Sequence, residues 1–416
     1  MKHLPAVAVG LALAALAGCF PEQWAEVSPD GRHLVYTGLK DNHPGVFLMT
    51  LDGKEPRRLA ASGFAPQFSP DGRYVAFQDD SGLVLYELAS QNRRLLVPAD
   101  KQAEPGLQMK FMLPQWRPDG RALAVTVYRN IRVADQERQE TALLLFNDLE
   151  KPEPQVVAEG VGLKCGWSPD GKRLAFFRKE GPGAELPESE LYWGSINIRE
   201  GNAPRAVAGV LFNPWQSVQW LATDRLLFVG TRVSLPMTIN DVDRARPAIH
   251  AYDLVTKGIS LVFEIPGGMD DLMAQWFALS PDRKRLLYCV TAGGASAPQL
   301  RLYDIATGES ATLATAMAQR YPFWVGNDRV GLFVNEHVLR LATVEDLKLA
   351  AQLEAAGKAD EAADHIAKNA RRLDLKAILA PLEKETPPAL TPAPPLSGQP
   401  APAPRNAAPP TPDRSR

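Results

Sequence analysis

The stretch that decides the fold is Ser28-Pro29-Asp30-Gly31-Arg32-His33-Leu34-Val35-Tyr36. Proline presets φ for the first central position of a turn, and aspartate accepts hydrogen bonds from amides beyond it. Glycine adopts the left-handed conformation that lets the chain reverse. The apolar run that follows is typical of a β-strand. The stretch therefore predicts a tight hairpin that leads into a buried strand.

The same signal recurs at 69–77, 117–125, 168–176 and 280–288, and degenerate copies follow Trp220 and Trp324. Successive copies begin near residues 28, 69, 117, 168, 221, 280 and 325, at steps of 41 to 59 residues. A period of this size is typical of WD-type propeller blades with four strands each. Because each blade must bury both faces against its neighbours, the copies predict an all-β fold, a β-propeller of seven four-stranded blades.

Residues 22–343 resemble the TolB-type propeller repeats, whose hallmark is Ser-Pro-Asp-Gly-Lys/Arg before an apolar strand. Related blades occur in the propellers of prolyl oligopeptidases. The resemblance implies a TolB-like propeller and says little about chemistry. TolB proteins carry six blades behind an N-terminal α/β domain, whereas this sequence shows seven repeats, a lipoprotein-type leader and a helical extension.

Residues 1–18 are predicted to be a signal peptide. A basic start precedes an apolar run at 4–17, which is too short to span a bilayer core and ends at Gly18-Cys19. Small residues directly before a cysteine resemble the bacterial lipoprotein signal, which implies that Cys19 is lipidated, becomes the N-terminus and anchors the chain in a membrane. An ordinary secretory peptide that ends in a cysteine is the alternative. Phe20 is not the aspartate of an inner-membrane retention signal, so the periplasmic side of the outer membrane is expected if the host is Gram-negative.

Composition narrows the class of protein. The 416 residues are 45% hydrophobic, which is enough for a large core. Lys and Arg number 46 against 48 Asp and Glu, a net charge of −2 that argues against a nucleic-acid partner bound through its phosphates. Three cysteines are too few for a disulfide scaffold. Cys165 and Cys289 fall in non-adjacent repeats, so both are predicted to be buried thiols.

The chain divides into a signal peptide (1–18), the propeller (19–343), a helical hairpin or extension (344–384) and a disordered Pro/Ala-rich tail (385–416). Helical spacing of apolar residues begins after residue 343, and 353–368 resembles one tetratricopeptide hairpin. We expect this hairpin to pack on the propeller and a third helix to start near Leu373. Proline fills 11 of the last 31 positions, which predicts a tail with polyproline II bias.

Motifs that carry catalysis do not occur: the sequence contains neither Gly-x-Ser-x-Gly nor His-Glu-x-x-His. Gly166 to Lys172 has the spacing of a phosphate loop, but Arg173 replaces the required Ser or Thr. The repeated aspartates are interpreted as turn residues. Asn240, Asp241 and Asp243 are interpreted as a solvated acidic loop rather than a Ca²⁺ site. The sequence thus predicts no catalytic residue, no metal and no cofactor.

Loop lengths predict which face of the propeller binds a partner. Long links open on one face, at 37–45, 98–113, 129–140, 178–189 and 230–247, and tight turns occupy the other. The inner strands are expected to start with polar residues that ring the channel mouth on the long-loop face. These candidate binding-face residues are Gln67, Gln115, Lys164, Gln219 and Gln275.

These observations predict a non-catalytic cell-envelope lipoprotein whose propeller binds a protein or peptide partner through its long-loop face. One alternative is a propeller-type lyase or hydrolase that acts on a glycan or lactone at the channel mouth. Another is a structural anchor that makes its contacts through the helical hairpin or the Pro-rich tail.

Overall fold

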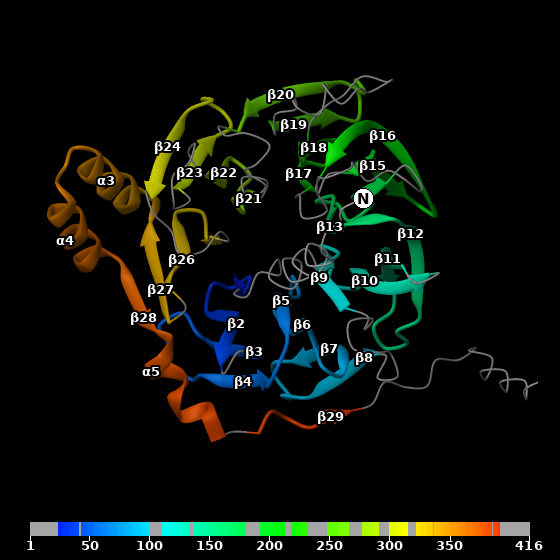
Figure 1. Ribbon diagram of the computed structural model, residues 1–416, viewed down its shortest axis with the longest axis horizontal. Coiled ribbons are helices and arrows are strands. Elements are labelled where there is room, and N and C mark those ends of the chain that lie inside the picture. Colours follow the sequence, from blue (N-terminus) through cyan, green and yellow to red (C-terminus); the bar gives the residue numbers. More distant parts are fainter. Residues whose placement is uncertain are drawn as a thin grey trace, which may run out of the picture.

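Each copy of the repeat forms the first hairpin of one four-stranded antiparallel sheet, and seven such sheets stand around a central axis (Figure 1). The protein is a seven-bladed β-propeller, which confirms the predicted fold class. The computed structural model describes residues 24–40, 43–99, 110–133, 136–179, 192–212, 218–230, 248–265, 277–290, 299–314, 322–335, 337–384 and 386–391.

Within each blade the chain runs from the axis to the rim. The innermost strands are β1 (Ala25–Val27), β5 (Phe64–Phe68), β9 (Lys110–Trp116), β13 (Val161–Trp167), β17 (Val218–Ala222), β21 (Phe277–Leu279) and β25 (Phe323–Val325). The second strands are β2 (His33–Lys40), β6 (Tyr74–Asp79), β10 (Leu123–Val133), β14 (Arg173–Lys179), β18 (Arg225–Gly230), β22 (Arg285–Val290) and β26 (Arg329–Asn335). The third strands are β3 (His43–Thr50), β7 (Gly82–Glu87), β11 (Gln136–Phe146), β15 (Tyr192–Glu200), β19 (Ala248–Asp253), β23 (Gln299–Asp304) and β27 (Val338–Thr343). The outer strands are β4 (Arg57–Ala60), β8 (Arg93–Pro98), β12 (Pro154–Glu159), β16 (Ala203–Phe212), β20 (Ile259–Glu264), β24 (Ser310–Ala314) and β28 (Arg371–Asp374).

The Pro-Asp-Gly turns are held by their own side chains. In the fourth blade the Ser168 hydroxyl donates to the Asp170 carboxylate at 2.6 Å, and that carboxylate also accepts the Lys172 amide at 3.1 Å. The hydrogen bond from Ser168 lowers the pKa of Asp170. The same serine-to-aspartate hydrogen bond recurs in three further blades, at Asp30, Asp71 and Asp282. The prediction that these aspartates build turns is confirmed.

Arg283 stands where the equivalent turns have glycine. Its φ is 59°, close to the 68° of Gly171, so a bulky residue adopts the left-handed conformation here, as expected. The amide of the preceding Asp282 donates to the Asn327 side chain of the next blade at 2.9 Å. This contact with the neighbouring blade helps to hold the strained turn.

The outer strand of the seventh blade comes from the segment predicted as a helical extension. After β27 the chain forms α3 (Val344–Ala355) and α4 (Ala359–Asn369) and returns as β28, antiparallel to β27. Residue 343 therefore ends a strand but not the propeller. Leu373, expected at the start of a third helix, lies in β28, and the helix α5 (Leu375–Leu379) begins after it. Four residues are too few for their spacing to separate a strand from a helix.

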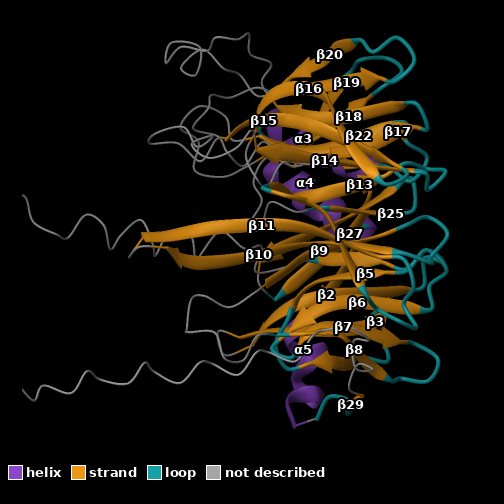
Figure 2. Ribbon diagram, turned by 90° about the vertical axis from the view of Figure 1, so that its right-hand side faces the viewer, coloured by secondary structure: helices purple, strands orange, loops and turns teal. Residues whose placement is uncertain are grey.

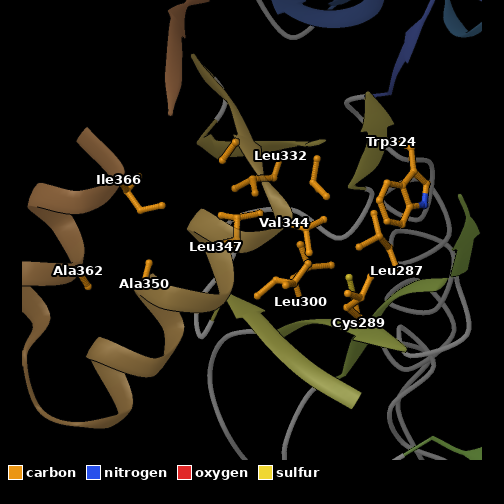
Figure 3. Close-up of a cluster of buried hydrophobic side chains, with 14 residues drawn as sticks. Leu287, Cys289, Leu300, Trp324, Leu332, Val344, Leu347, Ala350, Ala362 and Ile366 are labelled. Atoms are coloured by element: carbon orange, nitrogen blue, oxygen red, sulfur yellow. The ribbon is translucent and has the colours of Figure 1, made fainter. Parts of the chain in front are cut away.

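The helical hairpin packs on the propeller, as predicted. Val344 and Leu347 of α3 and Ile366 of α4 join the apolar cluster between the sixth and seventh blades (Figure 3). The two helices are also linked to each other, because His365 Nε2 lies 2.9 Å from an Asp346 carboxylate oxygen. A single hairpin that could not bury its own apolar face buries it here against β-sheet.

The chain then runs along the outside of the ring. We call residues 375–391 the strap: it comprises α5, the 3₁₀ helix η2 (Ala380–Lys384) and the strand β29 (Leu390–Thr391), which pairs in parallel with β8 of the second blade (Figure 1). The Arg93 guanidinium forms a buried ion pair with Asp79 and donates to the Pro388 carbonyl at 3.1 Å. The first residues of the predicted Pro-rich tail are thus bound to a blade, and residues 392–416 lie outside the described residues.

Among the described strands, none is shared between the first and last blades of the ring. An apolar cluster joins these two blades instead, and it contains Tyr36 and Phe47 of the first blade and Phe333 of the seventh. Leu375 and Leu382 of the strap belong to the same cluster. Because β29 continues to the second blade, the strap contacts three consecutive blades at the point of closure.

Indole hydrogen bonds join the innermost strands of neighbouring blades. In each, the Nε1 of a tryptophan donates to a main-chain carbonyl of the preceding blade. These bonds are Trp116 to Gln67 (3.3 Å), Trp167 to Gln115 (3.1 Å), Trp220 to Gly166 (2.8 Å) and Trp324 to Ala278 (3.0 Å). In these four blades the tryptophan before the turn therefore has a polar role as well as an apolar one.

Where the tryptophan is replaced, a side chain from the preceding blade makes the link. Phe68 stands at the tryptophan position of the second blade, and its amide donates to the Glu26 carboxylate at 2.6 Å. Leu279 stands there in the sixth blade, and its amide donates to the Gln219 carboxamide oxygen at 3.1 Å. The Gln219 amide group also donates to the Phe277 carbonyl at 2.8 Å. Glu26 and Gln219 thus replace the missing indoles.

Replacing Trp220 by Phe should remove the indole hydrogen bond while keeping most of the apolar contact. Because Gly166 would keep a carbonyl without its partner, we expect a loss of roughly 1–3 kcal/mol in the free energy of unfolding. Urea denaturation followed by far-UV circular dichroism measures this loss.

The matched control is Trp116→Phe, because its hydrogen bond is longer and only part-buried. Its loss of stability should be the smaller of the two. Equal stability of wild type and Trp220→Phe would contradict the role of the indole bond.

Candidate functional site: the channel and the long-loop face

The propeller has one plain face and one elaborated face. Described turns cluster on one side of the ring, and the hairpin of β10 and β11 projects from the other (Figure 2). Two of the predicted long links prove to be strands, since β2 and β3 pair out to Lys40 and His43, and β10 and β11 pair out to Val133 and Gln136. The strands simply continue their pairing past the ring. Residues 180–191 and 231–247 lie outside the described residues.

The β10–β11 hairpin is the described structure that reaches furthest on the elaborated face. Its pairing continues for eleven residue pairs without a shift in register, from Leu123–Phe146 to Val133–Gln136. The Arg129 guanidinium and the Glu140 carboxylate form a cross-strand ion pair at 2.6 Å near the base of the projection. A hairpin whose backbone pairing continues in register projects at a defined position, which suits a docking surface better than an open loop does.

Lys164 faces the axis and is the predicted site residue whose setting is most unusual. Its Nζ lies 5.7 Å from the centre of the Trp24 ring, although Trp24 precedes β1 of the first blade and Lys164 lies on β13 of the fourth. This cation–π contact therefore crosses the channel. Desolvation lowers the pKa of Lys164 to about 7, so its amine is partly neutral at physiological pH.

Two further ionisable groups on the innermost strands are withdrawn from water. Desolvation raises the pKa of the Glu26 carboxyl to about 8, against a smaller lowering by the amide of Phe68. Desolvation also lowers the pKa of Lys110, the first residue of β9. The innermost strands therefore carry one carboxyl group, Glu26, and two amines, Lys110 and Lys164, whose charged forms are disfavoured by burial. Such shifts occur in functional sites, and they also occur in tightly packed channels.

The glutamines predicted beside Lys164 have other positions and contacts. Gln67 is the fourth of five residues in β5, and Gln115 is the sixth of seven in β9, so both lie toward the turn-bearing ends of their strands. The reason is a bulge before each of them, where Ala65 and Leu113 have φ of 52° and 41°. These two glutamines do not start their strands as expected.

Gln219 does lie near the start of its strand, as the second residue of β17. Its carboxamide is engaged by the sixth blade, as described above, and the Gln115 side chain donates to the carbonyl of its own neighbour Pro114 at 3.0 Å. Gln275 lies outside the described residues. The structure therefore brings Lys164 to the channel but commits Gln115 and Gln219 to the framework.

Sequence reasoning missed Trp24 and Glu26. A sequence signal for both existed, because Trp24 and Lys164 occupy the same position of the repeat. Trp24 stands two residues before Glu26, whose side chain contacts the second blade. Lys164 stands two residues before Gly166, whose carbonyl contacts the fifth blade. An alignment of the innermost strands, rather than of the turns alone, would have paired these two residues at one level of the channel.

Metal-ligating side chains do not gather in the part of the chain that the structure describes, since no group of three or more His, Cys, Asp or Glu comes together there. Asn240, Asp241 and Asp243 fall outside that part. Cys165 and Cys289 are buried thiols, as predicted, and burial raises the pKa of the Cys165 thiol to about 12. Among the described residues no helix is long and apolar enough to cross a membrane.

Comparisons with known proteins agree with the fold. No family model matches this sequence, and no curated protein is similar to it in sequence. An oligogalacturonate lyase in complex with manganese matches with a TM-score of 0.53 and 14% identity, over 74% of this chain and 83% of that one. A puromycin-hydrolysing peptidase of Mycobacterium tuberculosis matches with a TM-score of 0.52 and 16% identity, over 77% of this chain and 51% of that one.

TolB from Acinetobacter baumannii is also similar, with a TM-score of 0.39 and 14% identity over 74% of this chain and 70% of that one. At these identities the likeness extends to the fold alone. Fold and site together define the chain as a seven-bladed β-propeller protein with one elaborated face and a Lys–Trp contact across its channel.

Glu26→Gln should change how stability depends on pH. Because the folded state raises the pKa of Glu26 from about 4.5 to about 8, the wild-type protein is stabilised below pH 4.5 and loses that contribution as pH rises toward 8. The glutamine variant lacks this titration, so it should be on the order of 5 kcal/mol more stable than wild type at pH 9 and within about 1 kcal/mol of it at pH 5.

Thermal unfolding at a series of pH values measures the gap between the two proteins. Glu264→Gln on the exposed outer strand β20 serves as the matched control and should show no gap. A constant difference between wild type and Glu26→Gln at every pH would contradict the assignment.

Proposed function

We propose that this protein is a non-catalytic cell-envelope lipoprotein whose propeller binds a protein or peptide partner on the long-loop face. The observation that carries the proposal is the β10–β11 hairpin, a paired projection on the face opposite the tight turns. Propeller folds place their variable binding elements in such links while the blades hold them in position. No nucleic-acid partner is proposed, because the net charge is −2.

The channel supports a binding role over an open substrate pocket. The Trp24 ring and the Lys164 amine meet near the axis, so a ligand that enters the channel as far as this pair contacts an aromatic ring and an amine. Tryptophan is among the residues that contribute most to protein interfaces. A partner that inserts one acidic or apolar side chain at this mouth would contact both.

The lipid anchor is part of the proposal. Cys19 follows the apolar leader and precedes the first blade by only a few residues, so acyl chains on Cys19 would hold the propeller close to the membrane surface. The proposed location is the periplasmic side of the outer membrane in a Gram-negative host, with the membrane itself as one partner.

A lyase or hydrolase acting on a glycan or lactone is the second candidate function. Lys164 favours it, because an amine with a pKa of about 7 can accept a proton at neutral pH. The similarity of fold to an oligogalacturonate lyase is consistent with this reading but does not extend to its site.

Shortening the β10–β11 hairpin tests the binding face. Replacing 130–139 by Asn-Gly leaves the pair Arg129–Glu140 next to a two-residue turn and keeps the register of the blade. Cross-linking and affinity purification from intact envelopes should recover the partner at least tenfold less with this variant than with wild type.

Arg121→Glu on the opposite face is the matched control and should recover the partner like wild type. Unchanged recovery with the shortened hairpin would contradict the face assignment. Turnover of a glycan or lactone that is abolished in Lys164→Met would instead favour the enzyme.

Cys19→Ser tests the anchor. The wild-type chain should incorporate an alkyne-tagged fatty acid and sediment with membranes, whereas the variant should lose the label and move to the soluble fraction by at least tenfold. A variant that sediments like wild type would refute lipidation as the anchor.

A further inference from the structure

The helical hairpin is an insertion that the repeat does not need. In the first six blades two to seven residues join the third strand to the outer strand, whereas 27 residues join β27 to β28. The insertion covers the rim where the sixth and seventh blades meet, far from the long-loop face and the channel. Because the hairpin is present in one blade and the other six fold without it, the repeat does not explain it.

The hairpin and the propeller together line a cavity of about 110 Å³ that is partly open to solvent. Its lining residues come from five elements, β24, β26, β27, α3 and α4. Apart from Arg340 and Glu354 they are apolar, and they include Leu313, Leu332, Leu347, Ala351 and Ile366. Figure 3 shows Ile366 directed from α4 toward Leu347 and Leu332. The cavity thus lies between the hairpin and the seventh blade, and the hairpin creates it.

One wall of this cavity is a cation. Arg340 lies on β27 opposite Leu332 of β26 and lines the cavity with its half-buried side chain. Within the described residues no hydrogen bond or ion pair is seen for its guanidinium. Burial and the charge of Arg372 lower the pKa of Arg340, while Glu354 at the end of α3 raises it.

The charges around the cavity favour an anion. Arg340 and Arg372 stand directly opposite each other in the β27–β28 register, and like charges in such a pair destabilise a sheet. Glu354, the acidic residue of the cavity lining, is exposed and offsets one of the two positive charges. A carboxylate bound to Arg340 would reduce the repulsion between Arg340 and Arg372. The planar guanidinium can donate two parallel hydrogen bonds to the two oxygens of a carboxylate.

We propose that this rim cavity binds a short branched aliphatic carboxylic acid, with its carboxylate on Arg340 and its alkyl group among Leu332, Leu347 and Ile366. A cavity of about 150 Å³ holds a six-carbon ring, so 110 Å³ holds an apolar body of roughly four carbons. An isobutyl group has this size. The small volume and the walls from five elements favour a free acid over the end of a peptide.

The test compares 3-methylbutanoate with 3-methylbutanamide, which has the same shape and no charge. Isothermal titration of the full chain should show the acid binding at least tenfold more tightly than the amide, because a guanidinium that expects a carboxylate discriminates against a neutral analogue. Arg340→Met should abolish the difference between the two probes.

Ala351→Phe is a second variant that fills the cavity and leaves Arg340 in place, so it keeps the test valid if Arg340→Met does not fold. Ala351→Phe should lose binding at least tenfold, whereas Leu349→Ala, an exposed residue on the same helix, should bind like wild type. No binding of the acid to wild type, equal binding of acid and amide, or unchanged binding by Ala351→Phe would each overturn the proposal. A peptide ending in leucine that binds tenfold more tightly than the free acid would also overturn it, in favour of a chain terminus.

Discussion

The constraint on which the structure depends is that every sheet is apolar on both faces. A four-stranded sheet of this kind cannot remain in water alone, and each of the seven apolar clusters lies between one pair of neighbouring blades. The ring must therefore close, or two faces would stay exposed. In the part of the chain that the structure describes, apolar contact joins the first and last blades, and the strap crosses them.

Apolar contact alone does not fix how far one blade turns against the next, and the polar links near the axis supply that geometry. Four tryptophans donate to the preceding blade, and Glu26 and Gln219 supply a side-chain acceptor at the two positions where Phe68 and Leu279 cannot donate from a ring. These indole, carboxyl and carboxamide groups near the axis therefore serve to join neighbouring blades. Lys164 and Trp24 differ because their contact crosses the channel between the fourth and first blades, which is why they mark the candidate site.

Features that depend on contacts between residues close in sequence could be predicted, and features that depend on distant contacts could not. The turn chemistry of Ser168 and Asp170 is local, so the blades and their number were predictable from it. The outer strand β28 and the strap were not, because their partners β27 and β8 lie about 30 and 300 residues away and their own stretches are too short for periodicity. The positions of Gln67 and Gln115 in their strands were predicted wrongly, because bulges with positive φ lie at Ala65 and Leu113. Neither alanine nor leucine favours that conformation, so the sequence does not indicate the bulges. Lys164 was found because its polarity contrasts with an apolar strand.

The rim and the axis follow different rules, and this separates the two proposed sites. Residues near the axis repeat from blade to blade, so a functional group there must depart from the repeat, as Trp24 does. The rim is free of that restriction: an outer edge can accept an added strand, as β8 accepts β29, or an inserted hairpin, as the seventh blade does. Arg340 shows what the insertion changes. In a plain blade its side chain would meet solvent at the rim or an apolar neighbour, whereas here it lines a partly open cavity together with residues of α3 and α4. If the hairpin served stability alone, an apolar residue would suit position 340 better than an arginine that lines the cavity.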